Sequence, residues 1–189
     1  MDYVSTNYCL NMKSIHMSGN SNGAMFTYFA ASQLSDVVAS VAPNIGSPLI
    51  GFGDVPLNPT ISLIDFHGLN DDTIPYDINS RHSRGNGPNG SVISWDYYYY
   101  EQKPNTIAKY VTAMNCAGNS NKYPTPMDGH QGWSCKIWSG CQGGTEVVLC
   151  TGNYGHDYPF MKRNGRSTRN TIEGTRIMWD FMKKHKRKN

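Results

Sequence analysis

Residues 14–34, SIHMSGNSNGAMFTYFAASQL, contain the pattern that decides the fold, because an extended segment, a tight turn and a helix follow one another there. Residues 14–17 are predicted to be extended, in a segment that ends at Gly19. Residues 24–34 are predicted to form a helix. Its inward face is expected at three- and four-residue spacing, at Met25, Tyr28, Phe29 and Ser32. A strand that turns directly into a helix is the repeating unit of α/β proteins.

The rest of the chain continues this alternation of strands and helices. Near-continuous apolar runs at 37–42 and 60–66 fit strands buried on both faces, and Pro43 is expected to end the first. The predicted helices are residues 105–115 and 170–184. Residues 134–138 and 145–151 are predicted to be two strands around a glycine-rich turn. The sequence therefore predicts one α/β domain, residues 1–189, with a mostly parallel sheet.

Residues 19–23 match the pattern G-x-S-x-G, with Ser21 at its centre. A nucleophilic serine of this type sits on a strained turn between a strand and a helix, which is the context predicted here. Gly19 and Gly23 remove side chains that would clash in such a turn, and the hydroxyl then lies at the positive end of the helix. The alternative is a glycine-rich turn with an idle serine.

A nucleophilic serine needs a histidine base and a carboxylate that orients it. Asp71 and Asp72 both follow the predicted strand 60–66, at a strand end where functional carboxylates lie. The residues alone leave the choice between the two open, and an Asp-Asp turn or helix cap is the alternative.

His156 is the best candidate for the base, because it follows the predicted strand 145–151 in the order serine, acid, histidine. His130 competes with it, but no predicted strand precedes His130. Of the other histidines, His16 is expected in the core or at a sheet edge. His82 and His185 are expected on the solvated surface.

Composition points to an extracellular protein. Charged residues make up 16% of the chain, against a usual fraction of about 25%. The net charge of +3 becomes −2 when the five basic residues of the tail 183–189 are removed, so a nucleic-acid partner is not expected. No apolar run is long enough for a membrane span. The tail is expected to be a frayed, solvated helix end.

The loop 77–94 is predicted to lie on the surface and contains an N-glycosylation sequon at Asn89. Trp95 and the tyrosines 97–100 follow it. We expect these aromatic side chains to pack in the core or at an interface; an aromatic groove for a feruloyl or sugar group is the alternative.

Five cysteines without CxxC pairs argue against a zinc site and favour two disulfides, hence an oxidising compartment. Cys9 is then left over, and residues 1–5 carry no signal-peptide pattern. We therefore expect that part of the domain, including a partner for Cys9, precedes Met1. A free thiol in a cytosolic protein is the alternative.

Three motifs together resemble a known family. Residues 18–25, residues 67–76 with the pattern HG-x-x-D-x-x-I-P-Y, and residues 155–159 with GH-x-Y-P are similar to the secreted esterases that include polyhydroxybutyrate depolymerases and feruloyl or acetylxylan esterases. The resemblance runs from about Cys9 to the last predicted helix. Tyr158 stands where the family usually has tryptophan.

The resemblance implies an α/β-hydrolase three-layer sandwich in which Ser21, Asp71 and His156 form the triad, so it selects Asp71 over Asp72. The backbone N–H of Asn22 would be one oxyanion donor. The family has several further strands before its serine turn, including a loop with the second donor. This chain is therefore expected to be the C-terminal portion of such a domain, lacking the N-terminal strands.

The family also tends to pair a cysteine at the end of the helix before the last strands with one in a Cys-x-x-Gly turn. Here these are Cys116 and Cys141. Cys135 and Cys150 remain, and the predicted hairpin would bring them opposite each other.

By this resemblance the chain is a secreted serine carboxylester hydrolase. Its expected substrates are feruloyl or acetyl esters on cell-wall polysaccharide, or a hydroxyalkanoate polyester. No cofactor, metal, nucleic acid or membrane partner is expected, and nothing in the sequence indicates an oligomeric state. The alternative is an inactive remnant or a non-catalytic glycan-binding domain of the same fold.

Overall fold

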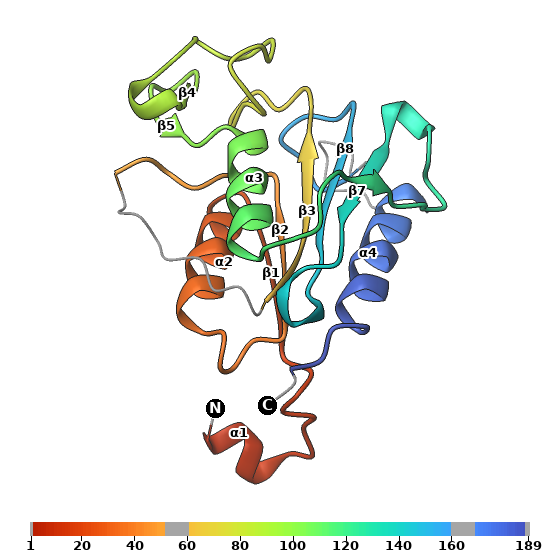
Figure 1. Ribbon diagram of the computed structural model, residues 1–189. Helices are drawn as coiled ribbons and strands as arrows, with labels where there is room; N and C mark the ends of the chain where they lie inside the picture. The colour runs from red at the N-terminus through yellow and green to blue at the C-terminus, as the bar shows by residue number, and fades with distance from the viewer. Residues whose placement is uncertain (1, 52–60, 160–168, 188–189) are drawn as a thin grey trace.

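A sheet of six strands forms the centre of the molecule (Figure 1), in a computed structural model that describes residues 2–51, 61–159 and 169–187. The strands across the sheet are β1 (His16–Asn20), β2 (Ser40–Asn44), β3 (Ser62–Gly68), β8 (Val147–Gly152), β7 (Ser134–Trp138) and β6 (Asn121–Lys122). Neighbouring strands are parallel from β1 to β8, whereas β7 and β6 each run antiparallel to the strand before them in this order. The fold is α/β with a mixed, mostly parallel sheet, which confirms that part of the prediction.

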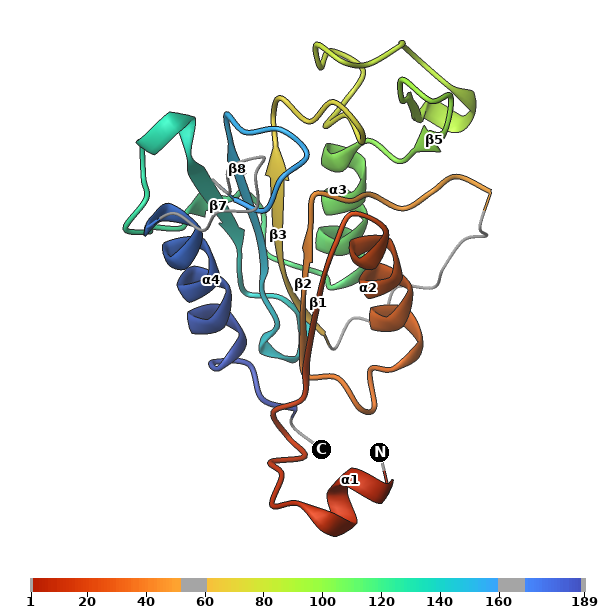
Figure 2. The ribbon, with the colours of Figure 1, turned by 180° about the vertical axis from the view of Figure 1, so that it is seen from behind.

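Helices cover both faces of this sheet (Figure 1, Figure 2). α2 (Asn22–Gln33) and α3 (Lys103–Ala113) lie on one face, and α4 (Arg169–Met182) lies on the other. Alternate residues of a strand point to opposite faces. In β3, therefore, Leu63 packs with α2 and α3, while Ile64 packs with α4. The core consists of two apolar layers, one on each side of the sheet.

The remaining elements are short. α1 (Asp2–Asn7) lies below the sheet in Figure 1. A separate hairpin is made of β4 (Val92–Ile93) and β5 (Tyr99–Tyr100), so part of the predicted surface loop is ordered as a strand. The 3-10 helices are η1 (Pro88–Gly90), η2 (His130–Gly132) and η3 (Gln142–Gly144). No helix within the described ranges is long and apolar enough to cross a membrane.

The buried face of α2 differs from the predicted one. Ala24, Thr27, Tyr28 and Ala31 are buried, whereas Phe29 is 50% exposed. The prediction of Phe29 as an inward residue was wrong, because small side chains and Tyr28 make up the face that packs on the sheet. The larger aromatic ring then lies on the outer face.

Pro43 lies inside β2 instead of ending it, although the sequence predicts a stop there. A proline removes one backbone donor, and the pairing continues beside it. The carbonyl of Asn44 accepts a hydrogen bond from the N–H of Ser21 at 2.9 Å, and the N–H of Ile45 donates to the carbonyl of Phe66 at 2.8 Å. Strand β3 begins at Ser62 in the structure. The sequence predicts a start at residue 60, which lies outside the described residues.

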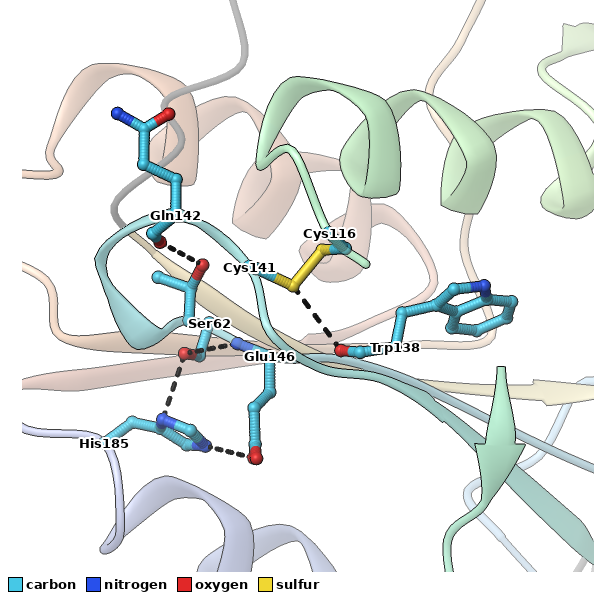
Figure 3. The surroundings of a disulfide bond; sticks show 8 residues. Ser62, Cys116, Trp138, Cys141, Gln142, Glu146 and His185 are labelled. Carbon is cyan, nitrogen blue, oxygen red and sulfur yellow. Dashed lines mark hydrogen bonds and ion pairs between the residues drawn. A yellow bond between two sulfur atoms is a disulfide. The ribbon is translucent and has the colours of Figure 1, made fainter. Parts of the chain in front are cut away.

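Two disulfides are present, Cys116–Cys141 and Cys135–Cys150. The first joins the segment after α3 to the turn before β8 (Figure 3). The second links register partners on β7 and β8, the antiparallel hairpin that the sequence predicts. Cys9 is an exposed free thiol in the structure.

The segment after α4 is solvated only in part: Lys183, Lys184 and Lys186 are exposed, as the sequence predicts, whereas His185 is half-buried. The Nδ1 atom of His185 lies 3.0 Å from the hydroxyl of Ser62, and its Nε2 atom lies 3.1 Å from the carboxylate of Glu146 (Figure 3). The prediction that His185 is solvated was wrong, because these two polar partners at the end of the sheet hold it. Residues 188–189 lie outside the described part.

Candidate active site

Ser21 occupies a strained turn between β1 and α2. Its backbone angles are φ 54° and ψ −118°, a region that residues other than glycine seldom adopt. Strain of this kind is found at functional sites where the surrounding structure enforces it. The hydrogen bond from the Ser21 N–H to the Asn44 carbonyl, 2.9 Å long, holds the turn against β2. The predicted serine turn is thus present as a local structure.

Two glycines let the backbone close around this serine. A Cβ atom on Gly19 would lie 2.2 Å from the carbonyl oxygen of Gly23, and one on Gly46 would lie 2.7 Å from the carbonyl oxygen of Ser21. A Cβ on Gly23 would meet nothing within 4 Å, so only the first glycine of the motif is needed for space. The expectation that both motif glycines relieve clashes is wrong for Gly23.

Asp71 lies in the loop that follows β3 and is completely buried. Its Oδ1 atom accepts hydrogen bonds from the backbone N–H groups of Thr73 at 2.9 Å and Ile74 at 2.8 Å. These bonds fix the carboxylate in one orientation. The carboxylate oxygens lie 3.0 and 2.9 Å from Nδ1 of His156. Asp71, not Asp72, is therefore the acid that hydrogen-bonds this histidine.

His156 lies between Asp71 and Ser21, in the loop after β8. Its Nε2 atom is 2.7 Å from the Ser21 hydroxyl oxygen. The geometry fits the tautomer in which Nδ1–H donates to Asp71, which leaves Nε2 as the acceptor of the serine proton. The structure thus brings together the three residues that the resemblance selects. The competitor His130 lies exposed in η2.

Burial and hydrogen bonding act in opposite directions on the pKa of His156. Burial disfavours the charged imidazolium, but it is outweighed by the hydrogen bond and negative charge of Asp71 together with the negative charges of Asp72 and Asp157. The pKa of His156 is therefore raised above the ordinary value of 6.5. A raised pKa suits a base that must hold a proton during the reaction.

A second histidine, His67, lies close to Asp71 and is fully buried. Its Nε2 atom is 3.0 Å from the carbonyl oxygen of Ile74 and 3.9 Å from the Asp71 carboxylate. Burial, followed by the nearby charge of Lys103, lowers the pKa of His67 to about 3. His67 is therefore neutral at pH 7, and its N–H supports the loop that carries Asp71.

A buried ion pair lies beneath the serine turn, and sequence reasoning missed it. Lys103 donates to Asp65 at 2.9 Å, to the hydroxyl of Tyr28 at 2.8 Å and to the carbonyl of Gly46 at 2.5 Å. Burial raises the pKa of Asp65 to about 6, although Lys103 opposes this rise. Since Gly46 contacts the backbone of Ser21, this network supports the turn from below. An aspartate within an apolar strand is the signal that could have revealed it.

Of the other predicted site residues, Asn22 directly follows Ser21, whereas Asn89 lies in a separate surface segment. Asn22 is the first residue of α2, so its backbone N–H is at the positive end of that helix. Asn89 is exposed in η1. No group of three or more His, Cys, Asp or Glu side chains able to hold a metal ion occurs in the described part of the chain.

Most of the aromatic run after the loop is exposed, so core packing is wrong for these residues, and packing at an interface stays a prediction. Only Tyr100 is buried. The exposed members are Trp95, Tyr97, Tyr98 and Tyr99. The reason is the hairpin register, which turns Tyr100 inward against Ile74 and leaves its neighbours outside.

Comparison with known proteins shows homology to fungal carbohydrate esterases. Feruloyl esterase B of Piromyces equi is 24% identical over 155 residues, which are 80% of this chain and 26% of that protein. A bifunctional acetylxylan esterase/xylanase of Neocallimastix patriciarum is 34% identical over 76 residues, 40% of this chain and 11% of that protein. The chain thus spans about a quarter or less of these relatives. No protein-family model matches the chain.

A solved structure shares the fold. An acetyl xylan esterase from Aspergillus awamori superposes with a TM-score of 0.50 at 13% sequence identity. The match covers 80% of this chain and 57% of that one. At 13% identity the match shows a shared fold, that is, a similar arrangement of helices and strands.

Proposed function

We propose that this chain, a homologue of feruloyl and acetylxylan esterases, is a serine carboxylester hydrolase of the α/β-hydrolase type. One observation carries the proposal: the continuous hydrogen-bonded line from Asp71 through His156 to Ser21. The strained backbone of Ser21 and its place between β1 and α2 support it as well.

The proposed reaction has two halves. The hydroxyl oxygen of Ser21 attacks the ester carbonyl, while Nε2 of His156 takes the hydroxyl proton. The imidazolium then returns this proton to the leaving alcohol, and the acyl group stays on Ser21. In the second half, His156 takes a proton from water, the hydroxide attacks the acyl group, and the acid leaves as Ser21 regains its proton. Asp71 stabilises the imidazolium in both halves.

The negative charge on the carbonyl oxygen needs hydrogen-bond donors. The backbone N–H of Asn22, the first residue of α2, is the donor that we assign. Because it is at the N-terminus of the helix, the helix dipole adds to its effect. No metal or cofactor takes part in this scheme.

The proposed substrates are feruloyl or acetyl esters on cell-wall polysaccharide, since the homologues are named for such esters. A hydroxyalkanoate polyester is the second candidate. The proposed location is extracellular. Two disulfides and the exposed sequon residue Asn89 support it, because disulfides persist in oxidising compartments.

We also propose that the sheet continues beyond β1 in the functional esterase. Strand β1 has no partner on its outer side among the residues described, and free strand edges are usually covered. Exposed aromatic side chains lie on both flanking helices, Phe26 and Phe29 on α2 and Trp179 on α4. His16 of β1 touches the ring of Trp179, with ring centroids 6.3 Å apart.

Covalent labelling tests the proposed nucleophile. A fluorophosphonate reagent phosphonylates activated serines, so we expect one label on Ser21, located by peptide mass spectrometry. Ser21→Ala and His156→Ala should abolish it, whereas the matched variants Ser32→Ala and His130→Ala should keep it. A chain with native circular dichroism that takes no label would favour the alternative, a non-catalytic domain of the same fold.

A further inference from the structure

Four large exposed aromatic side chains lie close together in the chain, in the turn of the β4–β5 hairpin and at the start of β5. Trp95 is 56% exposed, Tyr97 66%, Tyr98 54% and Tyr99 41%. Single exposed apolar residues are common, whereas several large ones in one short segment often mark a binding surface. The proposed reaction uses none of these side chains.

The hairpin is firmly attached to the body of the protein. Val92 and Tyr100 are buried and pack with Ile74, and Leu49 joins the same cluster. The carbonyl of Tyr99 accepts a hydrogen bond of 2.8 Å from the N–H of Ile50, and the N–H of Glu101 bonds the carbonyl of Pro48 at 2.8 Å. The exposed rings therefore stand on a fixed base.

The turn itself is held in one conformation. Tyr97 has φ 66°, an uncommon value for a tyrosine. The buried hydroxyl of Ser94 accepts a hydrogen bond from the N–H of Tyr98 at 3.0 Å. Arg84 donates to the carbonyl of Trp95 at 2.9 Å and to the Tyr97 hydroxyl at 3.0 Å, and its guanidinium lies 4.5 Å from the Tyr97 ring centroid. Such an arrangement reduces the entropy that binding a ligand would cost.

The hairpin lies near the carboxyl-terminal ends of the parallel strands, and Ser21, the proposed nucleophile, follows the carboxyl-terminal end of β1. Figure 1 shows β4 and β5 beyond the end of β3, on the side of α3. Ile74 belongs both to the hairpin cluster and to the loop of Asp71, since its N–H bonds the Asp71 carboxylate at 2.8 Å. Met25, in the first turns of α2 after Ser21, packs on the same cluster.

We propose that Trp95 and the tyrosines 97–99 form a platform that binds a neutral pyranose polysaccharide beside Ser21. This inference rests on the proposed function, since it names the part of the substrate that is not cleaved. Aromatic rings stack on the C–H faces of sugar rings, while tyrosine hydroxyls bond sugar hydroxyls. Tyrosine and tryptophan supply this area at little cost in side-chain entropy. Arg84, the cation that contacts these rings, is engaged with Tyr97, which suits an uncharged chain better than an anionic one.

Direct binding tests the platform without turnover. Ser21→Ala protein is run in native gels with and without soluble β-1,4-xylan, and binding of xylohexaose is measured by calorimetry. We expect xylan to retard this protein, and the further change Trp95→Ala with Tyr97→Ala to weaken xylohexaose binding about tenfold or more. The matched control, Phe26→Ala with Phe29→Ala, removes two similarly exposed rings from α2 and should leave binding unchanged.

Several outcomes would overturn the platform: no retardation by xylan, equal loss in the control variant, or adsorption to poly-3-hydroxybutyrate granules instead of xylan. If the double variant loses its native circular dichroism, Trp95→Ala alone carries the same test. Because the assay uses an inactive serine variant, failure of the esterase proposal, seen as absent labelling of Ser21, stays separate from failure of the platform.

Discussion

At the scale of single residues, the carboxylates around His156 set its pKa and therefore the pH range in which the proposed base is neutral. Asp157 raises the pKa of His156 by stabilising the imidazolium. Reaction requires the neutral imidazole, so the rate should fall as the pH drops through this raised pKa, which lies above 6.5.

Asp157→Asn removes one of these negative charges and should lower the pKa of His156, so the acidic limb moves to lower pH by a few tenths of a unit. The measurement is the rate of Ser21 phosphonylation against pH. Asp180→Asn removes a carboxylate at the far end of α4 and serves as the control. An acidic limb that moves to higher pH, or equally in both variants, would contradict the assignment of His156 as the base.

In the strand–turn–helix element, Gly19 leaves no space for a side chain, whereas Gly23 does. A methyl group on Gly19 would collide with the backbone at Gly23, whereas one on Gly23 enters open space within a helix. Overpacking against rigid backbone costs about 1–3 kcal/mol, and alanine favours a helix over glycine by about 1 kcal/mol.

We therefore expect Gly19→Ala to lower the free energy of unfolding by about 2 kcal/mol, and Gly23→Ala to leave it unchanged or raise it slightly. Urea titration followed by circular dichroism measures both. Equal destabilisation by the two substitutions would mean that the turn is not packed as the structure has it.

At the scale of the whole molecule, strand β1 has no partner on its outer side among the described residues, and one oxyanion donor is assigned. Loss of one oxyanion donor typically lowers turnover about 10²–10³-fold. We expect the 189 residues expressed alone to hydrolyse p-nitrophenyl acetate or methyl ferulate poorly, even when the fluorophosphonate reagent labels Ser21. Fusion to the upstream part of a homologous esterase should restore hydrolysis, and Ser21→Ala should abolish the gain.

Rapid, Ser21-dependent hydrolysis by the chain alone would contradict this expectation. It would mean that a second oxyanion donor lies within these residues, so the proposal that the sheet must continue beyond β1 for activity would fall.

The sequence by itself determined the local features of this protein. The serine turn, the β7–β8 hairpin and most helices follow from turn chemistry and side-chain periodicity over a few residues, which act within short segments. Each of the three motifs follows a predicted strand, and parallel strands bring their carboxyl-terminal ends to the same end of the sheet. Hence Ser21, Asp71 and His156 were candidates before their distances were known.

Only the tertiary structure decided the features that depend on contacts between distant segments. From the residues alone, Asp71 and Asp72 were equivalent, and the backbone bonds of Asp71 with its contact to His156 distinguish them. Lys103 reaches Asp65 through the core, a pairing that no local pattern encodes. The exposure of Trp95 depends on the hairpin register and on what packs beneath it. Burial and long-range pairing depend on how all the elements pack together, and a pattern over neighbouring residues does not determine that packing.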